Sequence, residues 1–124
     1  MAKIIKAISA EFFAMCAFLF GTMDGLMKAL IAFVIIDYIT GVISATFQKK
    51  LNSNVGFKGI AKKIMIFALV AVAHIVDEQL LGGTTSVLRS AVVGFYIANE
   101  RLSILENVGE FIDYPKNSDN FWNN

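Results

Sequence analysis

A long apolar stretch, residues 29–48, constrains the fold of this chain more than any other feature of the sequence. It reads ALIAFVIIDYITGVISATFQ, and its length matches the roughly 20 apolar residues that a helix needs to cross the hydrocarbon core of a bilayer. Its single charged residue, Asp37, lies near the middle, where a charge costs roughly 2.5–3.5 kcal/mol on insertion scales. The stretch therefore predicts a membrane helix whose carboxylate needs a partner or water.

The polar and small residues of this stretch fall on one side of the predicted helix. At the helical period, one stripe holds Asp37, Thr40, Gly41, Ser44 and Gln48. The opposite side is aliphatic and suits contact with lipid. We therefore expect the polar stripe to contact other helices or water.

The hydrophobic content of the chain, 56% of its 124 residues, exceeds the share of about 45–50% that is usual in soluble domains. The apolar residues form blocks with most charges between them, which predicts an all-α, polytopic membrane protein with three to four transmembrane helices. The predicted helices cover about residues 7–23, 29–48, 62–81 and 86–107. Together they would form a membrane helical domain over residues 1–108, followed by a polar C-terminal tail over 109–124. This organisation leaves no separate catalytic domain.

The linker after the central stretch is basic and contains no acidic residue. Its lysines are Lys49, Lys50, Lys58, Lys62 and Lys63. Because lysine-rich loops of membrane proteins stay on the cytoplasmic side, we expect residues 49–63 to form a cytoplasmic loop. Nucleic-acid binding is the alternative explanation of a basic segment, but no folded domain is predicted that would present it, so we expect no nucleic-acid partner.

The two ends of the chain carry weaker patterns. Lys3 and Lys6 precede the first apolar segment as in a signal peptide, but Glu11 interrupts that segment and no convincing cleavage site follows, so we expect a retained helix. A helix this short crosses where the bilayer thins, or lies at the interface. In the tail, Phe121 and Trp122 are candidate interface anchors.

The third segment is uniformly apolar in its first half and polar near its end. His74, Asp77 and Glu78 share one helical face there, which predicts a helix end that is wet or paired. A metal site is the alternative interpretation. Two acidic residues and the only histidine of the chain are few ligands for such a site. We expect neither a metal nor a cofactor.

The fourth segment separates polar from apolar residues. Its polar residues occupy roughly a third of the helical circumference: Arg89, Tyr96, Asn99, Glu100, Ser103, Glu106 and Asn107. The other side, where Arg101 is the exception, holds Ala91, Gly94, Ala98, Leu102 and Leu105. Such a helix crosses the membrane with its polar face buried, or lies on the membrane surface. Crossing is favoured because four crossings place both termini inside.

No pattern in the sequence indicates an enzyme. The chain has no Ser-His-Asp order with supporting turns, no phosphate-binding glycine loop and no CxxC motif. The pattern suits assembly instead, because membrane helices associate through small residues and buried polar groups. So small a chain can keep several polar stripes away from lipid only by forming a homo-oligomer or by lining a water-filled hole. The composition favours a pore and a purely structural assembly equally.

Four segments together resemble the phage holin family that includes the clostridial toxin-secretion holins. They are DYITGVISA (37–45), KKLNSNVGFKGIAKKI (49–64), AHIVD (73–77) and LRSAVVGFYIANERLSILENVG (88–109). The resemblance implies a small phage- or prophage-encoded protein of the bacterial cytoplasmic membrane. Such a protein oligomerises suddenly and forms lesions that release an endolysin or a large toxin. The holin and its cargo do not need to bind each other directly. The tail departs from the family in having few basic residues.

The family supplies no catalytic residues, so the candidate site residues come from the helical faces. The pore or helix-interface candidates are Asp37, Thr40, Gly41, Ser44, His74, Asp77, Arg89, Tyr96, Asn99 and Glu100. We expect these groups to lie in contacts between helices before the lesion forms and to face water afterwards. Two alternatives stay open: an antiholin, which binds a partner without making a hole, and a small ion-conducting channel.

Overall fold

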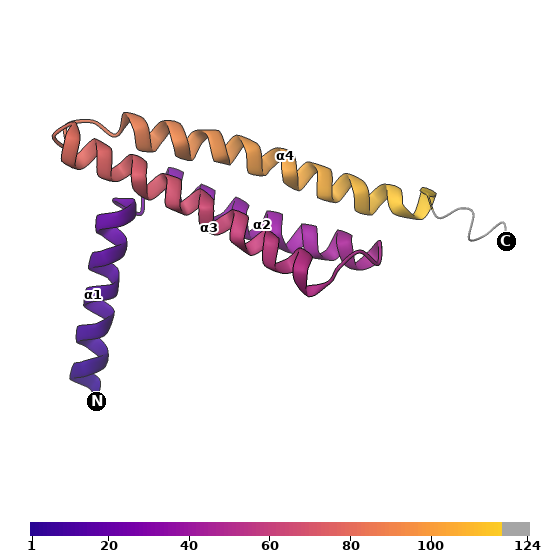
Figure 1. Ribbon diagram of the computed structural model, residues 1–124, viewed down its shortest axis with the longest axis horizontal. Coiled ribbons are helices and arrows are strands. Elements are labelled where there is room, and N and C mark those ends of the chain that lie inside the picture. Colours follow the sequence, from indigo (N-terminus) through magenta and orange to yellow (C-terminus); the bar gives the residue numbers. More distant parts are fainter. Residues whose placement is uncertain (118–124) are drawn as a thin grey trace.

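The computed structural model describes residues 1–117, and the regular structure within that range is helical throughout (Figure 1). The elements in order are α1 (Ala2–Phe20), α2 (Gly25–Phe47), α3 (Ser53–Ile75), the π-helical segment η1 (Val76–Leu80) and α4 (Val87–Asn117). The prediction of an all-α chain is confirmed for these residues. The candidate anchors Phe121 and Trp122 lie outside the described residues.

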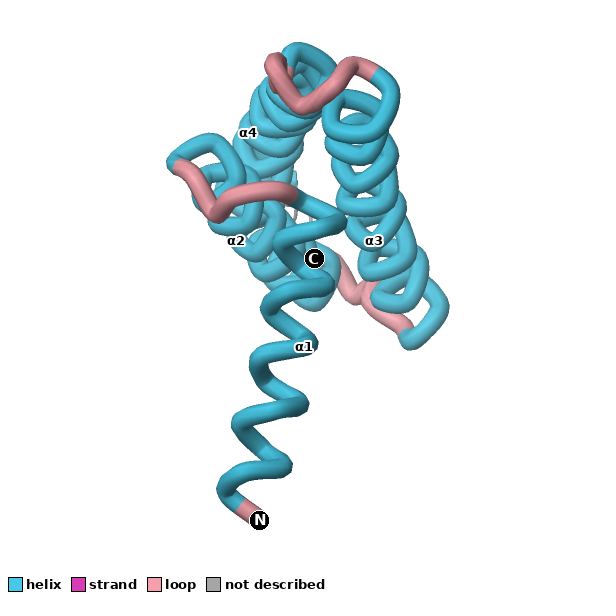
Figure 2. The backbone as a smooth tube through the Cα atoms, turned by 90° about the vertical axis from the view of Figure 1, so that its left-hand side faces the viewer, coloured by secondary structure: helices cyan, strands magenta, loops and turns pink. Residues whose placement is uncertain are grey.

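Helices α2, α3 and α4 lie side by side and form a bundle (Figure 1, Figure 2). α2 and α4 run in the same direction, and α3 runs against both. Side-chain contacts follow this order, since Arg89 near the start of α4 bonds to Asp24 at the start of α2. Toward the other end, Glu110 of α4 contacts Ser44 of α2. α4 therefore accompanies α2 along its whole length.

α1 contacts the bundle with its C-terminal end and extends away from it (Figure 1). None of its residues is buried. Phe20 at its end packs edge to face on Phe67 of α3, with ring centroids 6.1 Å apart. α1 is thus attached to the bundle at one point and does not lie alongside the other helices.

The helix expected over residues 7–23 is found earlier in the chain because Gly21 ends it. Gly21 has a φ of 78°, a left-handed conformation that glycine adopts readily. A Cβ added there would lie 2.8 Å from the Cε1 atom of His74. Glycine is therefore required where the chain turns from α1 toward α2.

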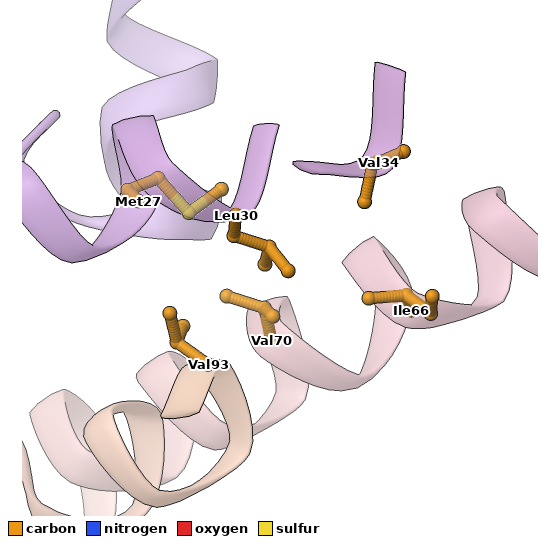
Figure 3. Close-up of a cluster of buried hydrophobic side chains, with 6 residues drawn as sticks. All are labelled: Met27, Leu30, Val34, Ile66, Val70 and Val93. Atoms are coloured by element: carbon orange, nitrogen blue, oxygen red, sulfur yellow. The ribbon is translucent and has the colours of Figure 1, made fainter. Parts of the chain in front are cut away.

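A small apolar core joins the three bundle helices. It consists of Met27, Leu30 and Val34 from α2, Ile66 and Val70 from α3, and Val93 from α4 (Figure 3). Many other large apolar side chains are on the outside: Ile35 and Ile39 of α2 are each 52% exposed. Asp77 and Glu100, in contrast, are each only 1% exposed. A soluble domain shows the opposite distribution, so this bundle suits a lipid environment.

Two helical segments are long and apolar enough to cross a membrane. They are α2 (Gly25–Phe47) and α3 continued by η1 (Ser53–Leu80). Within the described part of the chain, α1 and α4 do not meet the same criterion of length and composition. The three to four predicted crossings therefore depend on α1 and α4.

α3 begins well before the predicted start at residue 62. Asn52 caps its first turn, because its side chain accepts a hydrogen bond of 2.9 Å from the Val55 N–H. The predicted loop over 49–63 is wrong in extent: only residues 48–52 lie between the helices, and Lys58, Lys62 and Lys63 lie on α3.

Two glycines sit within the first turns of α3 and allow α2 to approach closely. The ring of Tyr38 from α2 packs over Gly56 and Gly59. A Cβ added to Gly59 would lie 3.3 Å from Tyr38 Cε2. The sequence predicts both glycines in a loop, but they lie on α3; a Cβ at Gly59 would require Tyr38 to shift by a few tenths of an ångström, whereas one at Gly56 would make ordinary contact.

α4 continues past the predicted end at residue 107 and includes the first part of the predicted tail. Residues 109–117 are helical, so the boundary at 108 is not a helix end. The extension is supported by contacts with the end of α2: Phe111 packs edge to face on Phe47, with ring centroids 5.0 Å apart.

Candidate functional site

The middle of the bundle holds a charged cluster, built from Asp37 of α2, Lys63 of α3, and Glu100, Asn107 and Thr40 around them. We call these five residues the central cluster. The Nζ atom of Lys63 donates hydrogen bonds to Asp37 and to both oxygens of Glu100, at 2.7 and 3.0 Å. Asp37 is 4% exposed and Glu100 1% exposed. One ammonium group therefore links two buried carboxylates from different helices.

The second oxygen of Asp37 is also satisfied. The Nδ2 group of Asn107 donates to Asp37 Oδ1 at 2.8 Å, to the Asp37 carbonyl at 3.1 Å and to Thr40 Oγ1 at 3.0 Å. Gly41 lies against this amide, and a Cβ added there would be in van der Waals contact with Asn107 Nδ2, at 3.4 Å. The carboxylate of Asp37 therefore has the partner that its depth requires.

The central cluster links the three helices of the bundle to one another. Removing one partner of a buried ion pair leaves a charge uncompensated and costs roughly 3–5 kcal/mol. Here Lys63 neutralises one of two carboxylates, so its loss would leave Asp37 and Glu100 facing each other without a counter-charge. A rearrangement of these helices must either keep these bonds or replace them with water or with groups of another chain.

A second polar group, the end cluster, lies where α1, α2 and α4 meet and consists of Asp24, Asp77 and Arg89. The Arg89 side chain is 4% exposed and donates four hydrogen bonds: to the Phe20 carbonyl at 2.6 Å, to the Thr22 carbonyl at 2.9 Å, and to Asp24 Oδ2 at 2.9 Å and Oδ1 at 3.4 Å. The hydrogen bond from Arg89 holds the pKa of Asp24 below its ordinary value, because it stabilises the carboxylate form. Arg89 thus connects the start of α4 to the turn between α1 and α2.

Asp77 caps α4 from the neighbouring element. Its two carboxylate oxygens accept hydrogen bonds from the backbone N–H groups of Leu88, at 3.2 Å, and Arg89, at 2.8 Å. A carboxylate at a helix N-terminus is also favoured by the helix dipole. Asp77 belongs to the π-helical segment η1. The helical period of this segment differs from that of α3, which changes the direction of the Asp77 side chain. His74 lies nearby, beside Gly21.

Ser44 belongs to a third polar group near the other end of α2. Its hydroxyl donates to Glu110 at 3.4 Å and accepts from Gln48 at 2.7 Å. Gln48 also donates to Glu110, at 3.3 Å. These bonds hold the end of α2 against the C-terminal half of α4.

The structure distributes the ten candidates over several places. Asp37, Thr40, Gly41 and Glu100 meet at the central cluster, and His74, Asp77 and Arg89 lie at or beside the end cluster. Ser44 is buried elsewhere on α2, Tyr96 packs against the apolar core, and Asn99 is exposed on α4 beside the central cluster. Their role as pore-lining residues stays a prediction.

Sequence reasoning missed the partners of these candidates. The lysine-rich pattern predicts a loop at Lys63 and therefore gives no indication of its contact with Asp37 and Glu100. Asn107 is predicted on the same polar helical face as Glu100 but is not among the site candidates, although it lies two helical turns after Glu100. Asp24 reads as a turn residue but is both the N-cap of α2 and the partner of Arg89. Among the described residues, no group of potential metal ligands could hold an ion.

Together, the apolar exterior, the buried charges and the two long apolar helices define a small helical membrane protein. Residues 14–117 match the model of the bacteriophage holin family, and the chain belongs to that family. Membership indicates a non-enzymatic membrane protein, in agreement with the resemblance found in the sequence.

Several relatives support this membership. A protein of Bacillus phage phi105 that bears the name "Probable holin" is 42% identical over 94 residues, which are 76% of this chain and 67% of the relative. An uncharacterized Listeria monocytogenes protein is 48% identical over 107 residues, 86% of this chain and 75% of the relative. An uncharacterized 14.9 kDa protein of Clostridium perfringens is 43% identical over 89 residues, 72% of this chain and 67% of the relative. No solved structure matches the chain.

Proposed function

We propose that this chain acts as a holin that assembles in the bacterial cytoplasmic membrane and forms lesions through which an endolysin reaches the cell wall. Export of a large toxin would be the same event with another cargo. The observation that carries the proposal is the central cluster: three ionisable side chains lie inside a bundle whose outer surface is apolar. Such a bundle is stable in lipid and also holds polar groups that can face water.

We place α2, α3 and α4 across the membrane. α4 is included because it follows α2 from the Arg89–Asp24 pair to the contact of Phe111 with Phe47. At 1.5 Å per residue, its 31 residues span about 46 Å and the 23 residues of α2 about 35 Å, so α4 extends beyond the membrane at its C-terminal end. α1 leaves the bundle at the opposite end, which supports an interfacial position for this helix.

The lysines set the orientation in this proposal. Lys49, Lys50 and Lys58 are exposed at or near the end of the bundle where α2 turns into α3. By the positive-inside rule this end is cytoplasmic. The C-terminal part of α4 then lies on the cytoplasmic side as well, and the end cluster and α1 lie on the outer side.

In this proposal the chain collects in the membrane without forming lesions until lysis, because buried charged groups have partners within each bundle. In the single bundle, Lys63 donates hydrogen bonds to both Asp37 and Glu100, and Arg89 pairs with Asp24, so these groups have partners without a water-filled path. Lesion formation requires helices to separate at the central cluster and to exchange these internal bonds for water. The central cluster therefore acts as a latch whose strength sets the moment of lysis.

Induced expression in a bacterium, with and without a cytosolic endolysin, tests the proposal. We expect abrupt growth arrest with release of a cytosolic reporter enzyme, and lysis only when the endolysin is present. Continued growth without leakage would contradict the proposal and indicate an antiholin. Arrest with leakage of ions alone would contradict it as well and indicate a narrow channel.

A further inference from the structure

α4 carries a regular apolar line on the side that faces away from α2 and α3. We call this line the outer seam; it consists of Phe95, Ala98, Leu102, Leu105, Gly109 and Ile112. The spacing alternates between three and four residues, and it continues back through Ala91 to Leu88. This is the heptad spacing with which two helices pack along their length.

The outer seam is uncovered in the described bundle. Phe95, Leu102 and Leu105 are 64%, 60% and 66% exposed. The inward side of the same helix repeats with the same period of seven residues, through Val93, Glu100 and Asn107, and contacts α2 and α3. In Figure 1, α4 forms one edge of the bundle, and no other helix lies on its outer side. The inward face of α4 therefore packs against α2 and α3 of the same chain, whereas the outer seam has no partner in the described bundle.

We propose that the outer seam binds the α4 helix of a second copy of this chain, with the two helices parallel and in register. The proposal rests on the proposed function, which places both copies in one membrane with the same orientation. A parallel pair related by a twofold axis along the membrane normal meets this condition. Ala98 and Gly109 let the two backbones approach closely, and the larger apolar side chains fill the space between them.

The charges beside the seam identify the occupant. Arg101 directly precedes Leu102, and Glu106 directly follows Leu105. In heptad notation these are a g and an e position, five residues apart, which face each other across a parallel helix pair. Each Arg101 would then pair with Glu106 of the other copy, so that one contact holds two ion pairs.

Lipid alone is a poor occupant of this face. Arg101 and Glu106 are both exposed and, within the described residues, neither takes part in an ion pair. They cannot pair within one helix, because residues five apart point about 140° away from each other. Arg101 follows Glu100 of the central cluster and so lies near the middle of α2, where an unpaired charge in lipid is costly. A second copy removes this cost.

Cysteine cross-linking in isolated membranes tests the contact. In a Cys16→Ser background, which removes the native cysteine, Ala98→Cys and Leu105→Cys should each form disulfide-linked dimers under mild oxidation. The matched control is Ile39→Cys, an exposed apolar position on α2 at similar depth. Dimers that form at the two seam positions no faster than at Ile39 would overturn the proposal.

Charge exchange tests the ion pairs separately. Arg101→Glu or Glu106→Arg should each lower the yield of the Ala98→Cys dimer about tenfold, because like charges would face each other. The double variant Arg101→Glu/Glu106→Arg should restore it, and failure to restore would overturn the assigned register. Cross-linking of the outer seam and lesion formation are measured in separate assays, so that the two proposals can fail separately. Lesions without seam cross-links would remove this inference alone, and cross-links without lesions would remove the proposed function alone.

Discussion

Replacement of Lys63 by methionine should destabilise the bundle strongly. Lys63 donates to Glu100 at 2.7 and 3.0 Å and pairs with Asp37, and both carboxylates are almost completely buried. Lys63→Met leaves these acids without a counter-charge, at a cost of roughly 3–5 kcal/mol. For a domain of this size that corresponds to a decrease in Tm on the order of 10 °C.

Thermal unfolding of the detergent-solubilised protein, followed by circular dichroism, measures this effect. Lys62→Met is the matched control, because Lys62 is the exposed neighbour of Lys63 and should leave Tm nearly unchanged. The triple variant Lys63→Met/Asp37→Asn/Glu100→Gln removes all three charges together and should recover most of the lost stability. Equal Tm values for Lys63→Met and Lys62→Met would refute the reasoning, and so would a triple variant that is less stable than Lys63→Met.

Three further predictions concern the ends and the middle of the bundle. Asp77→Ala should cost about 0.5–2 kcal/mol and speed hydrogen exchange in the first turn of α4; unchanged exchange there would argue against capping. Because Arg89 lowers the pKa of Asp24, their pair should stabilise the fold above the ordinary Asp pKa of 3.8 and lose this effect as pH falls through the lowered value. The stability difference between wild type and Asp24→Asn should therefore shrink in acid, and a constant difference would contradict this sign. Asp37→Leu should bring lysis forward and Ile39→Leu should not; unchanged timing and oligomer size for Asp37→Leu would count against the latch.

The helices and the class of protein could be predicted because the relevant patterns are local. Residues 29–48 contain enough apolar side chains to identify α2 without knowledge of any partner. The same holds for the polar face of the fourth segment, which contains Arg89 and Glu100. Both residues are buried in polar contacts.

The partners of the site could not be predicted because they depend on contacts between helices. The sequence around Lys63 shows five lysines and several turn formers, which favour a loop. That Asn52 caps a helix there, and that Tyr38 packs on Gly56 and Gly59, becomes visible only when α2 and α3 lie together. The long-range position of Lys63 opposite Asp37 follows from that packing.

The end of α4 was missed for a similar reason. The residues after Asn107 are polar enough to suggest a tail. They remain helical beside the end of α2, where Glu110 contacts Ser44 and Phe111 contacts Phe47. Local propensity was a weak guide here, because tertiary contacts extend the helix.

Release of cargo from liposomes tests the central claim most directly. The purified chain is reconstituted at increasing density into vesicles that contain a small dye and a folded protein of endolysin size. The account predicts that both are released together once a threshold density is reached. Release of the dye alone, or of neither at any density, would contradict the proposal that this chain forms protein-sized lesions.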